Sequence, residues 1–462
     1  MPAPTVPGLC ETPRVPGRGA GAVDDLLTAG SLRALGVKSS WSLVDQGLTA
    51  LTGFCVTFLL ARWLAPEIYG AYAIAFAGYL FVTGLHNVIV LEPMSVMGPS
   101  RHAGRMREYF RAQMVVHGVL VGICSAGVVC VALVVWRIAP TSPLAGAIAG
   151  SGLALPFLLF LFLTRRTCYV RQRPITAAIG SGSCFALTII GLYALRRFDL
   201  LSPFSVFLLV GMASLAGSYL VLRQIGVEAF RGPSATDERI VWTSALKENW
   251  CYGRWLVGST ILYSISGQVQ MFLVAGFLGL GAAGILRAMM LPASVMTQAV
   301  TAAGLLVLPG FSYDFGQGLV DRIRQRAVIV SGLLCAAGLC FAALLWVIAG
   351  RVEHLLFGGK FAAYAWLMPI LALIPAANGL TMGFSTALRA SQKPHFDLLA
   401  NAIAAPVAIV SAVSFIRWWG LAGAAASMVA GFVVYMGVNG CVFYGVPQAE
   451  LRREIRRRGE TA

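Results

Sequence analysis

Hydrophobic residues occur in runs of about twenty along nearly the whole chain, separated by short polar turns. A helix of about twenty apolar residues crosses the hydrocarbon core of a bilayer. The sequence lacks the alternating segments of about ten residues that are typical of transmembrane barrels. Since every backbone amide must be paired inside lipid, the pattern predicts an all-α polytopic membrane protein. We expect twelve spans: 40–62, 69–92, 113–136, 144–164, 175–195, 203–223, 253–276, 282–308, 327–349, 362–387, 396–416 and 420–443.

The composition agrees with lipid as the main solvent. Of the 462 residues 58% are hydrophobic and only 12% are charged, with a mean hydropathy of +0.77. A soluble chain carries about 25% charged residues. The spans divide the chain into a disordered or interfacial cytoplasmic tail (1–38), a six-helix half (39–224), a cytoplasmic linker with an amphipathic helix (225–252), a second six-helix half (253–446) and a basic cytoplasmic tail (447–462).

The basic residues predict the orientation. Alternate loops and both tails hold 27 of the 35 Lys and Arg, and the positive-inside rule assigns that side to the cytoplasm. The remaining eight are Arg62, Arg137, Arg196, Arg197, Arg287, Arg351, Lys360 and Arg417. Both termini are then cytoplasmic, which requires an even number of spans. This topology and anionic lipid headgroups account for the net charge of +16, so we expect no nucleic-acid partner.

The two halves carry similar motifs at nearly one spacing. Leu60–Leu64 followed by Gly70 corresponds to Val274–Leu278 followed by Gly284, at an offset of 214 residues. Two further pairs follow in the same order: Cys124–Gly127 with Cys335–Gly338, and Leu155-Pro156 with Ile374-Pro375. Six spans separate the partners, so the halves have the same orientation and form a parallel repeat. Halves related in this way can rock about a site near the midplane, which is the geometry of alternating access.

Polar side chains at helical spacing fall on the same two spans of each half. They are Asp45, Gln46, Thr49 and Thr52 in the first span, Tyr79, Thr83, His86, Asn87 and Glu92 in the second, Arg254, Thr260, Ser264 and Gln268 in the seventh, and Arg287, Ser294, Gln298 and Thr301 in the eighth. Polar groups at membrane depth are costly and tend to face a wet cavity or a partner. The alternative for each Ser and Thr is a hydrogen bond to its own helix backbone.

Among the charged candidates Arg287 stands out, because it lies inside a span with no acid near it in sequence. A guanidinium suits bidentate binding of phosphate or carboxylate, and the alternative is a packing role. Asp45, Glu92 and Arg254 fit interfacial charges equally well, and His86 fits a hydrogen-bonded packing residue.

Signatures of catalysis are missing from the sequence. There is no phosphate-binding G-x-x-x-x-G-K-[ST] loop, H-E-x-x-H or G-x-S-x-G motif. The ten cysteines show no C-x-x-C pair and no metal-ligand spacing, which favours packing roles. We therefore expect a protein that is not an enzyme, without catalytic residues, a metal or a cofactor.

Several motifs resemble polysaccharide-repeat flippases of the multidrug/oligosaccharidyl-lipid/polysaccharide exporter superfamily. They are Asp45-Gln46-Gly47, Leu60–Glu67 and Tyr69–Tyr72 in the first two spans, His86-Asn87 with Glu92–Val96 and Gly98-Pro99, and Gly281–Gly284 at the start of the second half. The resemblance in layout covers residues 40–446, and the motifs cover about a quarter of that length.

The resemblance implies two six-helix bundles around a cavity lined by spans 1, 2, 7 and 8. The substrate would be an oligosaccharide on undecaprenyl diphosphate, moved across the bacterial inner membrane for exopolysaccharide, O-antigen or capsule synthesis. The cavity residues would be Arg254, Arg287, Gln46, Asn87, Gln268 and Gln298. Asp45, His86 and Glu92 would be candidates for coupling to a proton or sodium ion. The partners would be membrane lipid, the lipid-linked oligosaccharide and the polysaccharide polymerase or export machinery.

Two other functions stay open at this point. A cation-coupled multidrug-type exporter of the same superfamily would be favoured by an acid-lined cavity. A membrane enzyme or scaffold of polysaccharide assembly would need acid and base residues that converge at the membrane surface. The sequence does not identify the sugar, the coupling ion, its stoichiometry or the oligomeric state.

Overall fold

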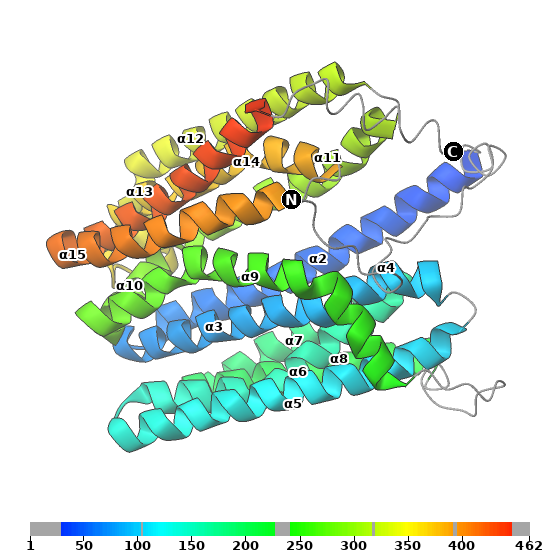
Figure 1. Cartoon of the computed structure of the whole chain (residues 1–462). Helices are drawn as coiled ribbons and strands as arrows, with labels where there is room; N and C mark the ends of the chain where they lie inside the picture. The colour runs from blue at the N-terminus through cyan, green and yellow to red at the C-terminus, as the bar shows by residue number, and fades with distance from the viewer. Residues whose placement is uncertain (1–28, 103–104, 227–240, 317–318, 391–394, 446–462) are drawn as a thin grey trace, which may run out of the picture. The chain divides into compact units, whose positions relative to one another are not determined.

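The computed structural model describes residues 29–102, 105–226, 241–316, 319–390 and 395–445, and within them every regular element is a helix. The helices of the first part of the chain are α2 (Ala29–Trp63), α3 (Pro66–His86), the π-helical η2 (Asn87–Leu91), α4 (Glu92–Arg101), α5 (Met106–Ile138), α6 (Pro143–Val170), α7 (Pro174–Arg197) and α8 (Pro203–Ile225). Those of the second part are α9 (Trp242–Leu278), α10 (Leu280–Met289), α11 (Leu291–Gly316), α12 (Val320–Phe357), the short η5 (Ala362–Tyr364), α13 (Leu367–Leu371), α14 (Leu373–Ala390) and α15 (His395–Gly445) (Figure 1).

The number of spans agrees with the prediction. Ten helical segments are long and apolar enough to cross a membrane, and the bent pair α10–α11, with an angle of 49°, provides an eleventh. The long helix α15 contains two helices that meet at Gly420, where φ is +57° and ψ is −130°. Dividing α15 there gives twelve spans, and the prediction of an all-α membrane protein is confirmed.

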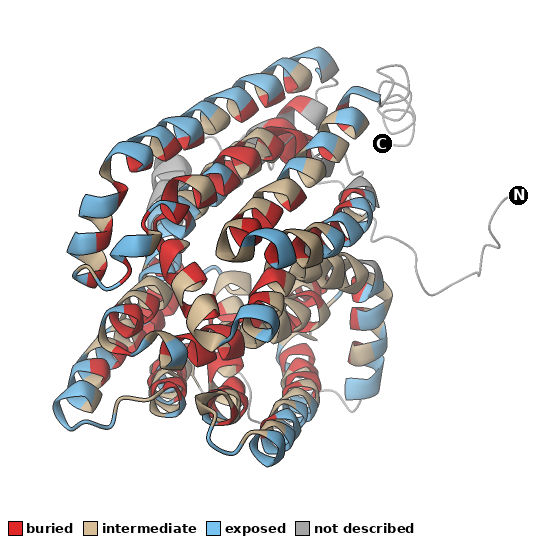
Figure 2. Ribbon diagram, turned by 90° about the vertical axis from the view of Figure 1, so that its left-hand side faces the viewer, coloured by how far each residue is buried: buried red, intermediate tan, exposed pale blue. Residues whose placement is uncertain are grey.

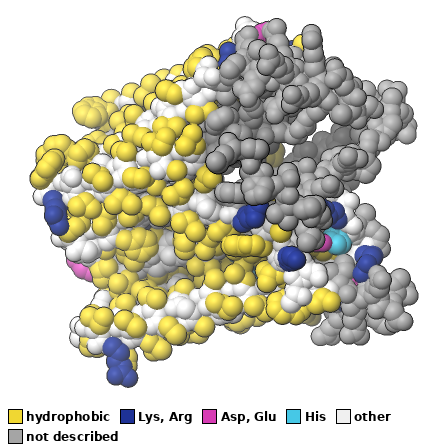
Figure 3. Space-filling model, in the orientation of Figure 1, with side chains coloured by type: hydrophobic (Ala, Val, Ile, Leu, Met, Phe, Trp, Pro, Cys, Tyr) yellow, Lys and Arg dark blue, Asp and Glu magenta, His cyan; other side chains and the backbone are white. Residues whose placement is uncertain are grey.

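Apolar side chains cover the outer faces of the spanning helices. On α5 the exposed residues include Ile123, Val131 and Val134, and on α12 they include Trp346 and Val347, which is 82% exposed. Buried and exposed positions alternate along each helix with helical spacing (Figure 2). Hydrophobic side chains dominate the described surface in Figure 3. A surface of this kind is stable in contact with lipid, where apolar exposure carries no hydration penalty.

By contacts between helices, the chain forms two compact units. The first contains residues 1–56 and 78–257, and the second contains residues 57–77 and 258–462. In the first unit α6 packs against α5, α7 and α8, and in the second α14 packs against α11, α12 and α15. The boundaries fall inside α2, α3 and α9, so the end of α2 and the start of α3 pack with the second unit. The predicted division into halves at residues 39–224 and 253–446 stays a prediction.

Glycines at equivalent positions of the predicted repeat meet within the second unit. A Cβ placed on Gly70 would lie 1.8 Å from the carbonyl oxygen of Leu280 and 3.1 Å from the amide nitrogen of Gly284. A Cβ placed on Gly284 would lie 2.3 Å from the carbonyl oxygen of Pro66 and 3.0 Å from the amide nitrogen of Gly70. Only residues without a side chain permit such an approach of two backbones. Reciprocal contact of equivalent residues is the arrangement that a two-fold relation between repeats produces.

Burial follows the same repeat. Helices α5 and α12 correspond to each other in the predicted repeat, and only 11% and 22% of the residues in their most apolar stretches are buried. The next pair, α6 and the span formed by α13 and α14, buries 56% and 72%, the two highest values among the spans. Corresponding helices therefore occupy corresponding environments, lipid-facing in one pair and central in the other.

Two helices begin earlier than the sequence suggested. Helix α2 starts at Ala29, so residues 29–38 of the predicted tail are helical and continuous with the first span. Helix α9 starts at Trp242, so the predicted linker helix runs into the seventh span without a break. The rest of the predicted amino-terminal tail (1–28), the middle of the linker (227–240) and the basic tail (447–462) lie outside the described residues.

Candidate functional site

Asp45 forms a buried ion pair in the first unit. Its carboxylate is completely buried, and Arg165 on α6 is 4% exposed. The Nη2 atom of Arg165 donates to Oδ2 of Asp45 at 2.6 Å, and Nε donates to Oδ1 at 3.0 Å. This is the bidentate geometry in which a guanidinium and a carboxylate match best. Asp45 is therefore a buried charge with a buried counter-charge, and its depth in the membrane stays a prediction.

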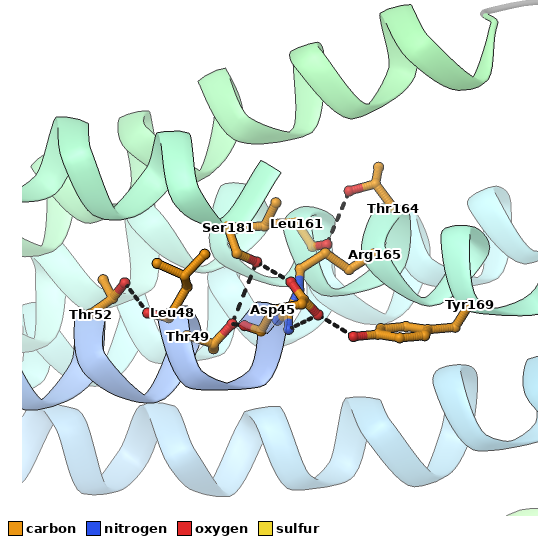
Figure 4. A network of polar contacts seen from close by, with 9 residues as sticks. All are labelled: Asp45, Leu48, Thr49, Thr52, Leu161, Thr164, Arg165, Tyr169 and Ser181. Carbon is orange, nitrogen blue, oxygen red and sulfur yellow. Dashed lines mark hydrogen bonds and ion pairs between the residues drawn. The ribbon is translucent and has the colours of Figure 1, made fainter. Parts of the chain in front are cut away.

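Two hydroxyl groups complete the surroundings of Asp45. Ser181 on α7 donates to Oδ1 at 2.5 Å, and the phenol of Tyr169 on α6 donates to Oδ2 (Figure 4). A carboxylate has about four lone-pair positions. Two donors from Arg165 and one each from Ser181 and Tyr169 fill them. Asp45 consequently joins α2, α6 and α7 and has no lone pair left for another ligand.

The sequence analysis counted Arg165 and Arg166 as residues of a cytoplasmic loop, but both lie inside α6, which continues to Val170. The apolar run ends at Thr164, so hydropathy alone ends the span too early. A signal was present in the spacing: Arg165 and Tyr169 are four residues apart and share one face of a helix. Their partner Asp45 is 120 residues from Arg165, and a single sequence contains no information on that distance.

A second polar cluster contains two histidines. Nε2 of His86, the last residue of α3, lies 2.9 Å from Nδ1 of His117 on α5, and both side chains are buried. The rings meet edge to face, with centroids 5.0 Å apart. The other ring nitrogen of His86, Nδ1, is buried without a hydrogen-bond partner among the described residues.

Asn87 lies next to this pair, and α6 provides its partner. Nη2 of Arg166 donates to Oδ1 of Asn87 at 3.1 Å. Asn87 is also the first residue of the π-helical segment η2. Segments of this kind are rare, and they are found frequently at functional sites. Glu92, the first residue of α4, is half-buried and within electrostatic range of Arg166. Burial, and to a lesser extent the charge of Glu92, raises the pKa of the Tyr252 phenol on α9.

Further polar contacts connect the start of α9 with α5 in the same unit. Gln113 and Asn249, both buried, exchange two amide hydrogen bonds, of 3.0 and 2.9 Å. Beside them, Nε2 of His102 lies 3.0 Å from Oε2 of Glu248. The hydrogen-bonding groups of this buried amide pair therefore satisfy each other.

In the second unit, Arg287 lies in the last turn of α10, directly before the bend to α11. Its side chain is half-buried, and its guanidinium carbon is 5.0 Å from the ring centroid of Phe76. Among the described residues no acid forms an ion pair with it. Arg287 is within electrostatic range of Tyr69, a buried phenol whose oxygen also has no hydrogen-bond partner among the described residues.

The other predicted cavity residues are divided between the two units. Gln46 and Arg254 are exposed residues of the first unit. Gln268 is half-buried and Gln298 is exposed, and both belong to the second unit. The structure thus groups His86, Asn87 and Glu92 around α6, while the membership of Gln46, Arg254, Gln268 and Gln298 in one cavity stays a prediction.

Most hydroxyl groups of the predicted stripes bond to their own helices. Thr49 donates to the carbonyl of Asp45 at 2.9 Å, Thr52 to Leu48 at 2.7 Å and Thr83 to Tyr79 at 2.9 Å. In the second unit Ser294 and Thr301 donate to the carbonyls of Leu291 and Thr297 in the same way. For these residues the backbone alternative is correct. No group of three or more His, Cys, Asp or Glu that could hold a metal ion occurs within the described ranges.

Comparison with known proteins gives one curated relative and many structural ones. The chain is 26% identical over 419 residues to the succinoglycan biosynthesis transport protein ExoT of Rhizobium meliloti (strain 1021). The aligned region covers 87% of this chain and 74% of that protein. No family model matches the sequence.

Solved structures with similar folds include transporters and a flippase. An inward-facing multidrug resistance MATE family transporter of the MOP superfamily has a TM-score of 0.72, with 12% identity over 89% of this chain and 99% of that one. The eukaryotic MATE transporter AtDTX14 has a TM-score of 0.64, with 15% identity over 92% and 99% of the two chains. The lipid II flippase MurJ in an inward closed conformation has a TM-score of 0.63, with 11% identity over 89% and 88%.

The MOP superfamily is the multidrug/oligosaccharidyl-lipid/polysaccharide exporter superfamily that the motifs indicated. Its fold, the twelve spans and the relation to a polysaccharide transport protein confirm the predicted resemblance. This chain is a multi-pass membrane protein with the fold of that superfamily, and it resembles the flippases within it.

Proposed function

We propose that this chain is a flippase that moves undecaprenyl-diphosphate-linked oligosaccharide repeat units across the bacterial inner membrane, by alternating access, for exopolysaccharide, O-antigen or capsule synthesis. The observation that carries the proposal is the similarity to the succinoglycan transport protein, which extends over 87% of this chain. Both termini would be cytoplasmic, as the distribution of Lys and Arg indicates. Membrane lipid and the lipid-linked oligosaccharide are the proposed partners, with polysaccharide polymerase or export machinery on the product side.

The distribution of charge supports an anionic rather than a cationic substrate. Asp45 is a fully buried acid of the first unit, and Arg165, Ser181 and Tyr169 occupy its oxygens, while Glu92, a half-buried acid of the same unit, lies within electrostatic range of the cation Arg166. A carboxylate with filled lone pairs and a neutralised charge attracts an organic cation weakly. Arg287, in contrast, is half-buried over an aromatic ring and has no ion-pair partner among the described residues. A guanidinium in that state suits the diphosphate of a lipid-linked sugar.

A cation-coupled multidrug-type exporter is the second candidate. It is supported by the likeness in fold to a multidrug resistance MATE family transporter, with a TM-score of 0.72. The fold serves both functions, so the substrate has to be identified from the site and by experiment.

The test compares a strain that lacks this protein with the same strain carrying a plasmid copy. If the flippase proposal is correct, undecaprenyl-diphosphate oligosaccharide accumulates on the cytoplasmic side of the deletion strain and surface polymer disappears. The wild-type gene restores the polymer. An unchanged lipid pool and unchanged polymer would rule the proposal out, and resistance to cationic drugs that depends on the gene would favour the exporter.

One pair of substitutions tests Arg287 in the same strain. Arg287→Ala removes the side chain that we propose binds the diphosphate. We expect at least a tenfold loss of polymer, since a hydrogen bond to a charged group contributes about 1.5–3 kcal/mol. Arg417→Ala is the matched control, because Arg417 makes a similar contact, with its guanidinium carbon 5.1 Å from the ring centroid of Phe277. Equal losses in the two variants at equal protein levels would contradict a specific role for Arg287.

A further inference from the structure

The pair of His86 and His117 is a buried group that the substrate site does not use. Each imidazole has two nitrogens, and a neutral ring has one donor and one acceptor. The hydrogen bond of 2.9 Å between Nε2 of His86 and Nδ1 of His117 needs a proton on one of these nitrogens. If His86 donates, its Nδ1 is a bare acceptor; if His117 donates, that Nδ1 carries an unpaired hydrogen.

In both tautomers one nitrogen of His86 stays buried and unsatisfied. Among the described residues nothing bonds to Nδ1 of His86. A buried polar atom without a hydrogen bond lowers the stability of the fold by about 1–3 kcal/mol. An apolar side chain of similar size at this position would avoid that cost. An ionisable residue that is retained inside a span at such a cost points to a functional role.

We propose that His86 and His117 form a proton-binding site, and that a proton is the ion that drives transport. This inference rests on the flippase function proposed above. One proton from the aqueous side would form an N–H bond with the ring nitrogen whose lone pair is free. The two neutral histidines would then become an imidazole–imidazolium pair. The same N–H bond would break when the proton is released on the opposite side.

The charged groups around the pair connect this step to a change in conformation. Arg166 from α6 is within electrostatic range of His86, His117 comes from α5, and Glu92 from α4 is within range of Arg166. When the histidine pair is neutral, the Arg166 guanidinium donates a hydrogen bond to Asn87. A positive charge on His86 would repel this guanidinium. Protonation therefore weakens the bond from Arg166 to Asn87.

Asn87 is the place where this loss has a mechanical effect. It begins the π-helical segment that joins α3 to α4, and a π segment stores one residue that an α-helix does not need. Release of Arg166 removes a contact that holds this segment, so the proton biases an element with two available geometries. Asp45 differs from the histidine pair, because four hydrogen bonds from Arg165, Ser181 and Tyr169 stabilise its ionised carboxylate.

The experiment uses proteoliposomes that contain the purified full chain and undecaprenyl-diphosphate oligosaccharide extracted from the deletion strain. A gradient of one pH unit at zero membrane potential acts on the wild-type protein. One proton per cycle shifts the leaflet distribution of the lipid by up to tenfold, the equivalent of about 1.4 kcal/mol. With His86→Gln or His117→Gln we expect the distribution to stay at unity under the same gradient. His354→Gln, on α12 in the second unit, is the matched control and should keep the tenfold shift.

The outcomes separate this inference from the function on which it rests. If the wild-type protein does not move the lipid at all, the proposed function is wrong. If it moves the lipid but a sodium gradient drives it, or if both Gln variants keep the response to pH, the proton site is wrong.

A second readout does not depend on transport or on the stability of a variant. Protein with ¹⁵N-labelled histidine in nanodiscs is titrated between about pH 5 and pH 9. The chain has five histidines, and we expect the signals of two of them to change together as one coupled pair. If His86 and His117 keep a single protonation state across this range in the wild-type protein, the proposal is overturned.

Discussion

Breaking the ion pair between Asp45 and Arg165 from one side should destabilise the fold strongly. Asp45→Asn leaves a guanidinium that is 4% exposed without its counter-charge, and Arg165→Gln leaves a fully buried carboxylate. Removing one partner of a buried pair costs about 3–5 kcal/mol, because the remaining charge keeps its desolvation penalty. The double variant has an amide opposite an amide and no charge. It should therefore be more stable than either single variant.

The measurement is thermal unfolding of the purified protein in detergent, followed by the fluorescence of its ten tryptophans. Arg105→Gln provides the control for a partly exposed pair: Arg105 is 39% exposed and lies 2.9 Å from Glu108, which is 12% exposed. Pairs of that kind contribute about 0.2–1 kcal/mol, so we expect a small shift for the control and large shifts for both single variants.

The order of the variants decides the question. The expected order of melting temperature is wild type, then the double variant, then the two single variants. If each single variant melts with the Arg105→Gln control, Asp45 and Arg165 do not form a buried pair. If the double variant loses the sum of the two single losses, the residues act independently and the bidentate geometry has no energetic meaning.

Two further predictions concern packing and helix ends. Gly70→Ala places a methyl group against the carbonyl of Leu280 and should lower the free energy of unfolding by at least about 1–3 kcal/mol. Gly78→Ala on the same helix is the control, because its methyl group meets nothing within 4 Å and the change should be neutral or stabilising. Equal melting temperatures of the two variants would refute the close approach. Partial burial lowers the pKa of Lys360, so the unfolded chain binds more protons than the folded one between the folded pKa and 10.5. The stability of the wild type relative to Lys360→Met should thus rise with pH toward 10.5, and a flat difference in melting temperature would contradict this.

The twelve spans could be predicted from the sequence because a single physical requirement dominates them. A chain in lipid must bury its backbone amides in helices of about twenty apolar residues, and each such run is a local property of the sequence. Even the repeat was visible, since Gly70 and Gly284 keep their spacing to the preceding motifs. That these two glycines touch each other is a tertiary fact, and only the structure reveals it.

The polar clusters could be predicted only in part. Asp45, His86 and Asn87 were selected because they are polar residues in apolar runs. Their partners follow from no such pattern. Hydropathy places Arg166 in a loop, and Gln113 and His117, four residues apart in a largely apolar span, do not indicate which helix they face. Since the basic partners of the three selected residues lie 31 to 120 residues away, the pairing of these clusters depends on helix packing, which no local pattern encodes.

Most of the basic residues outside the predicted cytoplasmic set have a local explanation. Helix carbonyl ends carry partial negative charge and stabilise cations in the last turn. Five of the eight exceptions lie in the last turn of a helix: Arg62, Arg137, Arg196, Arg197 and Arg287. Lys360 donates to the carbonyls of Ala61 and Leu64 at the end of α2, while Arg62 donates to those of Leu355 and Leu356 at the end of α12. These two helix ends therefore cap each other.

The end of α10 is a bend inside a span, so Arg287 is a separate case, and five of the eight exceptions (Arg62, Arg137, Arg196, Arg197 and Lys360) can be assigned to helix ends where the chain leaves a span. Among the described residues of the predicted cytoplasmic set, Arg101 and Arg223 also lie in last turns, those of α4 and α8. Arg287, Arg351 and Arg417 are then the exceptions that such a helix end does not explain. Cations that stabilise helix ends carry no information about sidedness, so the five exceptions at helix ends do not argue against the predicted orientation, and cytoplasmic termini stay a prediction of the positive-inside rule.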